Sequence, residues 1–371
     1  MNDKDEYQES EDSSETISIS DLSKRGYQLL KENYIDEAVE CFVQIIEVDE
    51  ANNYALVGLG DAARKKRDFR KAVTYYQECL DHHPGNNYAL FGLADCYKAL
   101  NQYKQAIEIW EQYLKHDDGN VTVLTRVADA YRKVKDFRRS KEIYQRALKA
   151  EEDNAYALIG LGHLHYDFRE YDQALLYWGK MFEFNENNVD IRVLTSIGNC
   201  HRKLKTFHDG LGFFQMALDL EPHNFYALFG MADCYRGLND QPNSLIYWNK
   251  ILSRDPNNKV ILTRAGETYR NMAQYDEAEE HYKAALNIEF DEYAILGLAL
   301  ISKMRGNYRD AIVSLKGLLK NDAKNHRLYT EIAECHLKLK ERNQAIEILN
   351  EFQQLGIRNS YVSEMLSGLS R

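Results

Sequence analysis

Small residues return along this chain with a period of about 34 positions, among apolar residues spaced as on one face of a helix. One track of small residues consists of Gly26, Gly60, Ala94, Ala128, Gly162, Gly198, Ala232, Gly266, Ala299 and Ala333. A second track follows twelve positions later and consists of Ala38, Ala72, Ala106, Ser140, Ala174, Gly210, Ser244, Ala278, Ala311 and Ala345. A repeat of this length is one supersecondary unit that buries its apolar face only against its neighbours. The pattern therefore predicts an array of about ten repeats.

Each repeat has the pattern of two short helices. In the segment 86–118, Asn86 is a typical helix cap, because its side chain can accept N–H bonds that lack an intrahelical partner. The buried stripe of the first helix then holds Leu90, Leu93, Ala94 and Tyr97. After a polar break, the stripe of a second helix holds Ala106, Trp110 and Tyr113. The pattern predicts αα-hairpins, with the small residues at places where helix axes approach closely.

The capping asparagine recurs eight residues before the small residue of the first track. It stands at Asn52, Asn86, Asn120, Asn154, Asn224, Asn258 and Asn325. Asn188 stands ten residues before Gly198, so we expect a two-residue insertion between these two positions. Aromatic side chains recur on the second helix at Phe42, Tyr76, Trp110, Tyr144, Trp178, Phe214, Trp248 and Tyr282.

This order of small and aromatic positions, closed by a proline or an acidic turn, resembles the tetratricopeptide repeat over about residues 19–358. Pro84, Pro222 and Pro256 match that family's inter-repeat proline. The resemblance implies an all-α, right-handed α-solenoid of about ten helix-turn-helix repeats, in which the first helix of each pair lines the concave surface. It also implies a non-catalytic scaffold or adaptor that binds a protein or peptide segment. The long array with few prolines is similar to bacterial arrays, including those of spirochaetes.

Composition divides the chain into three parts. Residues 1–18 are acidic and polar, which is typical of a disordered tail. The array of repeats spans 19–358, and residues 359–371 have the apolar spacing of a C-terminal capping helix. Seven acidic residues and one lysine lie in 1–17, so this tail carries much of the net charge of −11. The remaining array is close to neutral, which argues against nucleic acid as a partner.

Neither a membrane-spanning segment nor a secretory signal is apparent in the sequence. Four of the six cysteines, Cys96, Cys200, Cys234 and Cys335, occupy one repeat position, and no CxxC pair exists. We therefore expect reduced core thiols and a cytoplasmic protein.

Tyrosine and arginine dominate the residues that the resemblance assigns to the concave surface, and these residue types supply most of the binding energy in interfaces. The predicted partner-binding residues are Tyr54, Tyr88, Phe91, Arg126, Arg132, Tyr156, Arg202, Tyr226, Phe229, Arg236, Arg264 and Arg270. The alternative is a solvated face on which carboxylates neutralise these cations within each helix. Such pairs are expected at Asp61–Arg64, Asp95–Lys98, Asp129–Arg132, Asp233–Arg236, Glu267–Arg270 and Glu334–Lys338.

From the third repeat onward, first helices also alternate between two sequence types. One type reads Tyr-Ala-Leu, as at Tyr88, Tyr156 and Tyr226, and the other reads Leu-Thr-Arg or similar, as at Leu124 and Leu262. The alternation indicates a two-repeat module. It predicts alternating aromatic and Thr/Arg rungs on the concave wall, unless it reflects duplication history alone.

The sequence favours no enzyme, cofactor or metal site. Residues 58–63 have the spacing of a dinucleotide fingerprint but lie inside a first helix, with no strand before them. His163 and His165 are two apart on a helix and point to different faces, so we expect a structural role. The chaperone-tail carboxylate clamp of the family is also missing, because Thr122 and Val260 replace its lysine.

Two other functional interpretations remain open. The first is a structural protein that associates with itself through the array edges, which a concentration-dependent mass would reveal. The second adds autoinhibition, in which the acidic tail occupies the concave groove and competes with partners. The partner's identity and the oligomeric state do not follow from the sequence.

Overall fold

The computed structural model describes residues 18–184 and 190–369, and within these ranges the chain is all α-helical. It divides into two compact units, Met1–Glu186 and Asn187–Arg371. The first unit contains α1 (Ile19–Glu32), α2 (Ile35–Val48), α3 (Asn53–Lys65), α4 (Phe69–His82), α5 (Asn87–Ala99), α6 (Tyr103–His116), α7 (Val121–Lys133), α8 (Phe137–Ala150), α9 (Ala155–Asp167) and α10 (Tyr171–Phe184).

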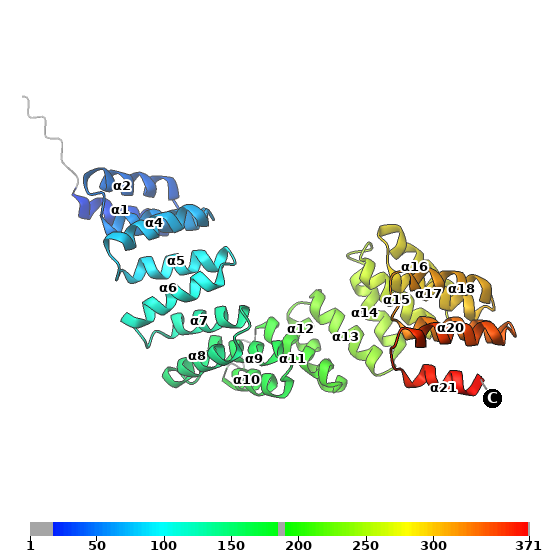
Figure 1. The fold of residues 1–371 in the computed structure, drawn as a ribbon. Helices are drawn as coiled ribbons and strands as arrows, with labels where there is room; N and C mark the ends of the chain where they lie inside the picture. The colour runs from blue at the N-terminus through cyan, green and yellow to red at the C-terminus, as the bar shows by residue number, and fades with distance from the viewer. Residues whose placement is uncertain (1–17, 185–189, 370–371) are drawn as a thin grey trace, which may run out of the picture. The chain divides into compact units, whose positions relative to one another are not determined.

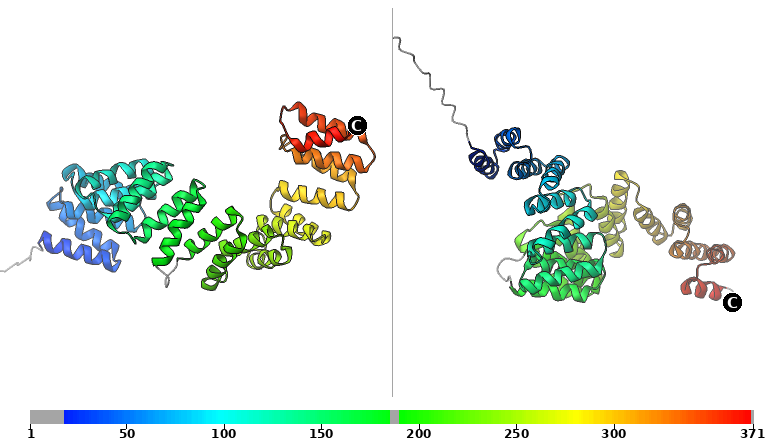
Figure 2. Two further views of the ribbon diagram at one scale, coloured as in Figure 1. Left: turned by 90° about the horizontal axis from the view of Figure 1, so that it is seen from below. Right: turned by 60° about the vertical axis from the view of Figure 1, so that its left-hand side comes forward.

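The second unit contains α11 (Ile191–Leu204), α12 (Phe207–Leu220), α13 (Phe225–Gly237), α14 (Gln241–Leu252), α15 (Lys259–Asn271), α16 (Tyr275–Ile288), α17 (Glu292–Met304), α18 (Tyr308–Leu319), α19 (His326–Lys338), α20 (Arg342–Gln354) and α21 (Ser360–Leu369). In both units the helices form consecutive hairpins, and each hairpin packs on the next (Figures 1 and 2). Odd-numbered helices up to α19 are the first helices of the repeats and even-numbered ones are the second helices. The fold is therefore an α-solenoid of helix-turn-helix repeats.

The first helices begin where the asparagine pattern predicts. The Asn86 side chain accepts the backbone N–H of Ala89 at 3.0 Å. The same cap is formed at Asn52, Asn120, Asn154, Asn224 and Asn258, and Asn325 caps α19 by accepting the N–H of Arg327. The prediction was wrong at α11, because Asp190 is its cap and stands eight residues before Gly198. Asn188 lies outside the described residues, and the two extra residues precede α11 rather than entering it.

A residue with left-handed backbone links the first to the second helix in every repeat. These residues stand seven positions after the small residue, at Asn33, Arg67, Asn101, Lys135, Arg169, Lys205, Asn239, Ala273, Gly306 and Lys340. In the turn after α5, the N–H of Asn101 donates to the Lys98 carbonyl, and the N–H of Gln102 donates to the Tyr97 carbonyl. These bonds satisfy carbonyls at the helix end and hold the tight turn.

Glycines of the first helices make room for aromatic rings of the second helices. Tyr76 of α4 lies between α3 and α5 and is fully buried. A Cβ added to Gly60 would come within 2.6 Å of the Tyr76 ring, and one added to Gly92 within 2.3 Å. The rings of Phe42, Tyr144, Phe214 and Tyr282 approach the glycine of the following first helix in the same way, at Gly58, Gly160, Gly230 and Gly297.

The alternation of first helices has a cause in packing. Helices α3, α5, α9, α13 and α17 carry glycine two residues before the small position, and each contacts the preceding first helix directly. Helices α7, α15 and α19 carry Arg126, Arg264 and Glu331 there, and they contact the preceding first helix less. The second helices before α7 and α15 present Trp110 and Trp248 in place of tyrosine or phenylalanine. Ring size and glycine thus vary together along the array.

Helix α21 closes the second unit. Its Val362 is buried, and Met365, Leu366 and Leu369 pack against the apolar cluster of α18, α19 and α20. The guanidinium of Arg342 on α20 donates to the carbonyl of Leu369. Helix α21 therefore shields the apolar end of the last repeat from water.

Candidate interaction surface

One stripe of each first helix lies mostly outside the buried core. It consists of the positions six and three residues before the small residue and one and four residues after it, which share a face of an α-helix. We call these positions together the first-helix face; most of their side chains are exposed or half-buried. Several successive first helices contact one another, and no pair of second helices contacts to the same extent. Each unit therefore curves with its first helices on the inner side.

A row of tyrosines marks the N-terminal end of the first-helix face. Tyr54, Tyr88, Tyr156 and Tyr226 are well exposed, and Tyr88 reaches 80 %. Tyr293 occupies the same position on α17 and is exposed to a similar extent, 77 %. These rings leave apolar area exposed to water at the same end of successive first helices.

Arginine and carboxylate side chains form a ladder across the first helices of the first unit. Arg64 of α3 pairs with Asp61 at 3.0 Å and with Asp95 of α5 at 3.4 Å. Arg126 of α7 reaches back to Asp95 at 2.5 Å. Lys98 of α5 pairs forward with Asp129 of α7 at 3.3 Å. The last rung joins Arg132 of α7 to Asp129 at 2.8 Å and to Asp167 of α9 at 2.6 Å.

The second unit repeats this ladder in part. Arg202 of α11 pairs with Asp233 of α13, which also accepts from Arg236 at 2.6 Å. Arg264 of α15 pairs with Glu267 of its own helix at 3.1 Å. Lys303 of α17 pairs with Glu331 at 2.6 Å and with Glu334, both on α19.

The ladder shifts the pKa values of its carboxyl groups in both directions. For Asp129 and Asp233, burial is the largest single influence and raises the pKa, but hydrogen bonds and attraction from neighbouring cations outweigh it. The net result is a lowered pKa at both groups. At Asp95, burial raises the pKa, and the attraction of Arg126 and Arg64 offsets only part of that rise. Neighbouring cations therefore stabilise the charged carboxylate more strongly at Asp129 and Asp233 than at Asp95.

The in-helix pairs expected from the sequence form only in part. They are present at Asp61–Arg64, Asp129–Arg132 and Asp233–Arg236. Lys98 pairs instead with Asp129, Glu267 pairs with Arg264, and Glu334 pairs with Lys303. Lys98 and Glu334 thus pair with a neighbouring first helix, whereas Glu267 pairs with the arginine on its N-terminal side in the same helix.

Two of the predicted arginines lie over predicted aromatic rings. The Arg126 guanidinium lies 4.9 Å from the centre of the Phe91 ring, and that of Arg202 lies 6.0 Å from the centre of the Phe229 ring. These contacts join residues of neighbouring first helices into one surface within each unit. All twelve residues predicted from the sequence lie on first helices from α3 to α15.

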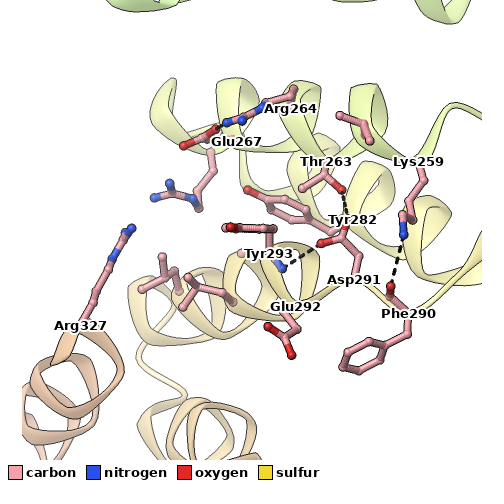
Figure 3. Close-up of a pocket in the computed structure, with 15 residues that line it drawn as sticks. Lys259, Thr263, Arg264, Glu267, Tyr282, Phe290, Asp291, Glu292, Tyr293 and Arg327 are labelled. Atoms are coloured by element: carbon pink, nitrogen blue, oxygen red, sulfur yellow. Dashed lines mark hydrogen bonds and ion pairs between the residues drawn. The ribbon is translucent and has the colours of Figure 1, made fainter. Parts of the chain in front are cut away.

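A pocket of about 560 Å³ opens on the first-helix face between α15, α17 and α19 (Figure 3). Arg264, Glu267 and Arg270 of α15 line it on one side, and Arg327 of α19 points toward it from another element. Its apolar lining comes from Val260, Phe290, Tyr293, Leu296 and Leu300. The pocket thus combines guanidinium groups with apolar surface, as ligand sites commonly do.

Two pocket residues, Arg264 and Arg270, are among the predicted partner-binding residues, whereas Tyr293 and Arg327 are not. Repeat register could have identified both, because they stand six residues before the small residue, as Tyr88 does. Lys259 and Phe290 carry no such signal, since they lie at a helix end and in a loop whose placement depends on packing.

The histidines and cysteines that could carry chemistry are held in contacts within the repeats. Nδ1 of the buried His165 lies 2.6 Å from Glu170, and Nδ1 of His201 lies 2.8 Å from Thr206. All six cysteines are buried, and burial raises the pKa of Cys96 and of Cys234 to about 12. Across 18–184 and 190–369, no three His, Cys, Asp or Glu side chains are grouped as metal ligands. In the same ranges no helix has the length and apolarity needed to cross a membrane.

Comparison with known proteins agrees with this repeat structure. Family models described as tetratricopeptide repeat match residues 63–126, 126–185, 226–258, 261–292 and 304–353, well over half of the chain. No curated protein sequence matches the chain.

Two solved structures of repeat proteins have a similar fold. A tetratricopeptide repeat protein from Parabacteroides merdae is 15% identical with a TM-score of 0.53, and the match covers 67% of this chain and 98% of that one. The C-terminal part of a repeat-containing protein from Cytophaga hutchinsonii is 18% identical with a TM-score of 0.56, covering 65% and 99%. At these identities the likeness concerns the fold alone.

Proposed function

Because this chain belongs to the tetratricopeptide repeat family, a family of interaction scaffolds that are generally non-catalytic, we propose that it is a non-catalytic adaptor that binds a protein or peptide segment along the first-helix face. The observation that carries the proposal is the tyrosine row. The side chains of Tyr88, Tyr156 and Tyr226 are largely exposed at equivalent positions of three repeats. Tyrosine is enriched in protein interfaces, where binding buries its ring. A segment laid across the first helices of either unit would cover the exposed rings of that unit.

The ladder supports the same assignment. Most of its cations already have carboxylate partners, so the face is close to neutral and presents apolar rings between paired charges. Such a surface suits a protein segment with apolar anchors better than a polyanion, which needs unpaired positive charge. The six buried thiols suit a reducing compartment, which supports a cytoplasmic location.

Affinity capture with matched variants tests the proposal. One variant carries Tyr88→Ala, Tyr156→Ala and Tyr226→Ala on first helices. The control variant carries Val48→Ala, Ile246→Ala and Val313→Ala, three exposed apolar residues of second helices. Wild type and control should retain the same bound proteins, identified by mass spectrometry, and the tyrosine variant should lose them. Circular dichroism checks that both variants are folded.

Equal capture by the tyrosine variant and wild type would reject the first-helix face as the binding surface. Loss of capture in the second-helix control alone would place the interaction on the opposite side of the array.

A further inference from the structure

The ladder of the second unit lacks one carboxylate, at the pocket between α15, α17 and α19. In four repeats the cation four residues after the small residue pairs with a carboxylate one residue after the small residue of the next first helix. These pairs are Arg64–Asp95, Lys98–Asp129, Arg202–Asp233 and Lys303–Glu334. Arg270 has the same place on α15, but the matching residue of α17 is Leu300.

The other positions that supply a carboxylate elsewhere in the ladder do not pair with Arg270 either. Arg132, whose matching residue is His163, pairs with Asp167 four positions further along α9. The residue of α17 at that place is Met304. Glu267, one turn before Arg270, pairs with Arg264. Within the described residues, no ion pair joins Arg270 to a carboxylate.

Arg270 is nevertheless placed where a guanidinium needs a partner. Its Nε is buried and, among the described residues, makes no hydrogen bond. The group lies against Tyr282, whose pKa is raised chiefly by burial and held back by a hydrogen bond from Arg270. A buried unpaired guanidinium nitrogen is costly, so its retention beside a pocket indicates that an anion completes the site.

The pocket supplies room and further recognition for that anion. Its volume is about 560 Å³, and Arg264 and Arg327 line it together with Arg270. Arg327 is half exposed, and its only ion pair in the described part of the chain is a long one of 3.8 Å to Glu331. Tyr293 and Leu296 line the same pocket, and Figure 3 shows the Tyr293 side chain inside it.

We propose that this pocket binds an aspartate or glutamate side chain of the partner, together with a neighbouring apolar side chain that packs on Tyr293 and Leu296. The acidic side chain would supply the carboxylate that Leu300 does not. Arg–carboxylate pairs favour this geometry because both groups are planar and can form two parallel bonds. The inference rests on the proposed function, since it names the chemistry of the segment bound on the first-helix face.

The experiment selects displayed random 12-residue peptides on the full-length chain and then measures one synthetic, fluorescein-labelled peptide by anisotropy. Selected sequences should share an acidic residue beside an apolar one. Arg270→Gln should weaken binding by roughly tenfold, as expected for loss of a hydrogen bond to a charged group. Leu300→Asp should weaken it similarly, because the new carboxylate would pair with Arg270 within the chain. Arg309→Gln, which removes an exposed arginine of α18, should bind as wild type does.

A peptide with glutamine in place of its acidic residue completes a double-mutant cycle. It should bind wild type about tenfold more weakly, yet show little further loss with Arg270→Gln. This cycle decides the question even where circular dichroism shows that Leu300→Asp does not fold. Equal affinity of the acidic peptide for wild type and Arg270→Gln overturns the inference.

The outcomes also separate this inference from the proposed function. Peptides that lose affinity for the variant with Tyr88→Ala, Tyr156→Ala and Tyr226→Ala, but not for Arg270→Gln, would reject the acidic pocket and retain the first-helix face. Peptides indifferent to both sets of substitutions would reject both proposals.

Discussion

Guanidinium groups on and beside the first-helix face are of two kinds. Arg132 and Arg202 are largely buried. Arg132 pairs with Asp129 and Asp167 and Arg202 pairs with Asp233, so these ion pairs stabilise the fold and are not free for a partner. Arg264 and Arg327 are more exposed and have one carboxylate each in the described chain, while Arg270 has none. Residue type alone made these arginines equivalent candidates for binding. Their partners distinguish those that hold the repeats together from those left for a ligand.

Asp233 is the residue whose loss should show the structural role of the ladder. Asp233→Asn leaves Arg202 and Arg236 without their charged partner at a site only 9 % exposed, so the free energy of unfolding should fall by about 1–3 kcal/mol. Urea unfolding at neutral pH measures the change. Asp276→Asn is the control, because its carboxylate is 92 % exposed, and it should cause no measurable change.

The same prediction has a pH dependence of fixed sign. The pKa of Asp233 is lowered in the folded chain, so the carboxylate stabilises the fold fully above its unfolded pKa of about 4. This contribution is lost as pH falls through the lowered folded value, where wild type carries a neutral carboxyl like the amide of the variant. A difference between the two proteins that persisted unchanged at pH 2 would contradict an ionic role.

At the scale of single residues, some ion pairs of the ladder could be predicted from the sequence and others could not. Pairs within one helix follow from i,i+3 spacing and were predicted, and three of them form. Pairs such as Arg126 with Asp95 join residues 31 positions apart. They depend on the separation and rotation of two first helices, which repeat spacing does not fix.

At the scale of elements, aromatic rings of the second helices fill the space that glycines of the first helices leave. Phe214 fits between α11 and α13 because Gly198 and Gly230 have no side chain to fill that space. Trp110 and Trp248 precede first helices that carry arginine instead of glycine. The alternation read from the sequence therefore corresponds to two kinds of interface between repeats.

Gly230→Ala should destabilise the chain although alanine favours helices more than glycine does. The added Cβ would lie 2.2 Å from the Phe214 ring, and such overpacking costs about 1–3 kcal/mol against a gain of about 1 kcal/mol in helix propensity. Thermal unfolding followed by circular dichroism measures the difference.

Gly212→Ala in α12 is the matched control, because no atom lies within 4 Å of its added Cβ. It should stabilise the chain by about 0.5–1 kcal/mol. Similar stabilisation by both substitutions would show that the Phe214 ring can move aside.

Element boundaries were predicted well where a cap or small residue marks them and less well elsewhere. Seven asparagine caps were confirmed, but the cap of α11 is Asp190, since a single asparagine near an insertion does not reveal which register the helix adopts. The left-handed turn residue was not recognised. It is held by Lys135, Arg169 and Ala273 among others, so no run of glycines announces it.

At the scale of the whole molecule, the helices contact mainly their neighbours in the sequence. Helices pack against sequence neighbours within each unit, so stability should be distributed repeat by repeat. The sequence predicted this architecture because each repeat carries its own full signal. It could not predict the pocket between α15, α17 and α19. The pocket depends on how these three helices pack, and the unpaired Arg270 in it depends on Leu300 replacing the carboxylate of the ladder.

Removal of residues 359–371 should have a local effect. It would uncover the apolar surface that Val362 and Leu366 cover. Amide hydrogen exchange should rise by at least about tenfold in α20 and change little in α1 to α10, because distant repeats unfold independently. Faster exchange throughout the first unit would contradict a local array and indicate one cooperative domain.

The matching of ring and glycine also limits how such a chain can change its length. Deletion of the single repeat 121–154 would join Asn120 to Ala155 and keep the helix cap, but it would set Trp110 against Gly160. Deletion of the two repeats 87–154 would instead set Tyr76 against Gly160, as it now lies against Gly92. The shorter deletion should therefore melt at a lower temperature than the longer one. From α5 onward, ring and glycine therefore stay matched when two repeats are removed together, so the pair of repeats is the packing unit of this part of the array.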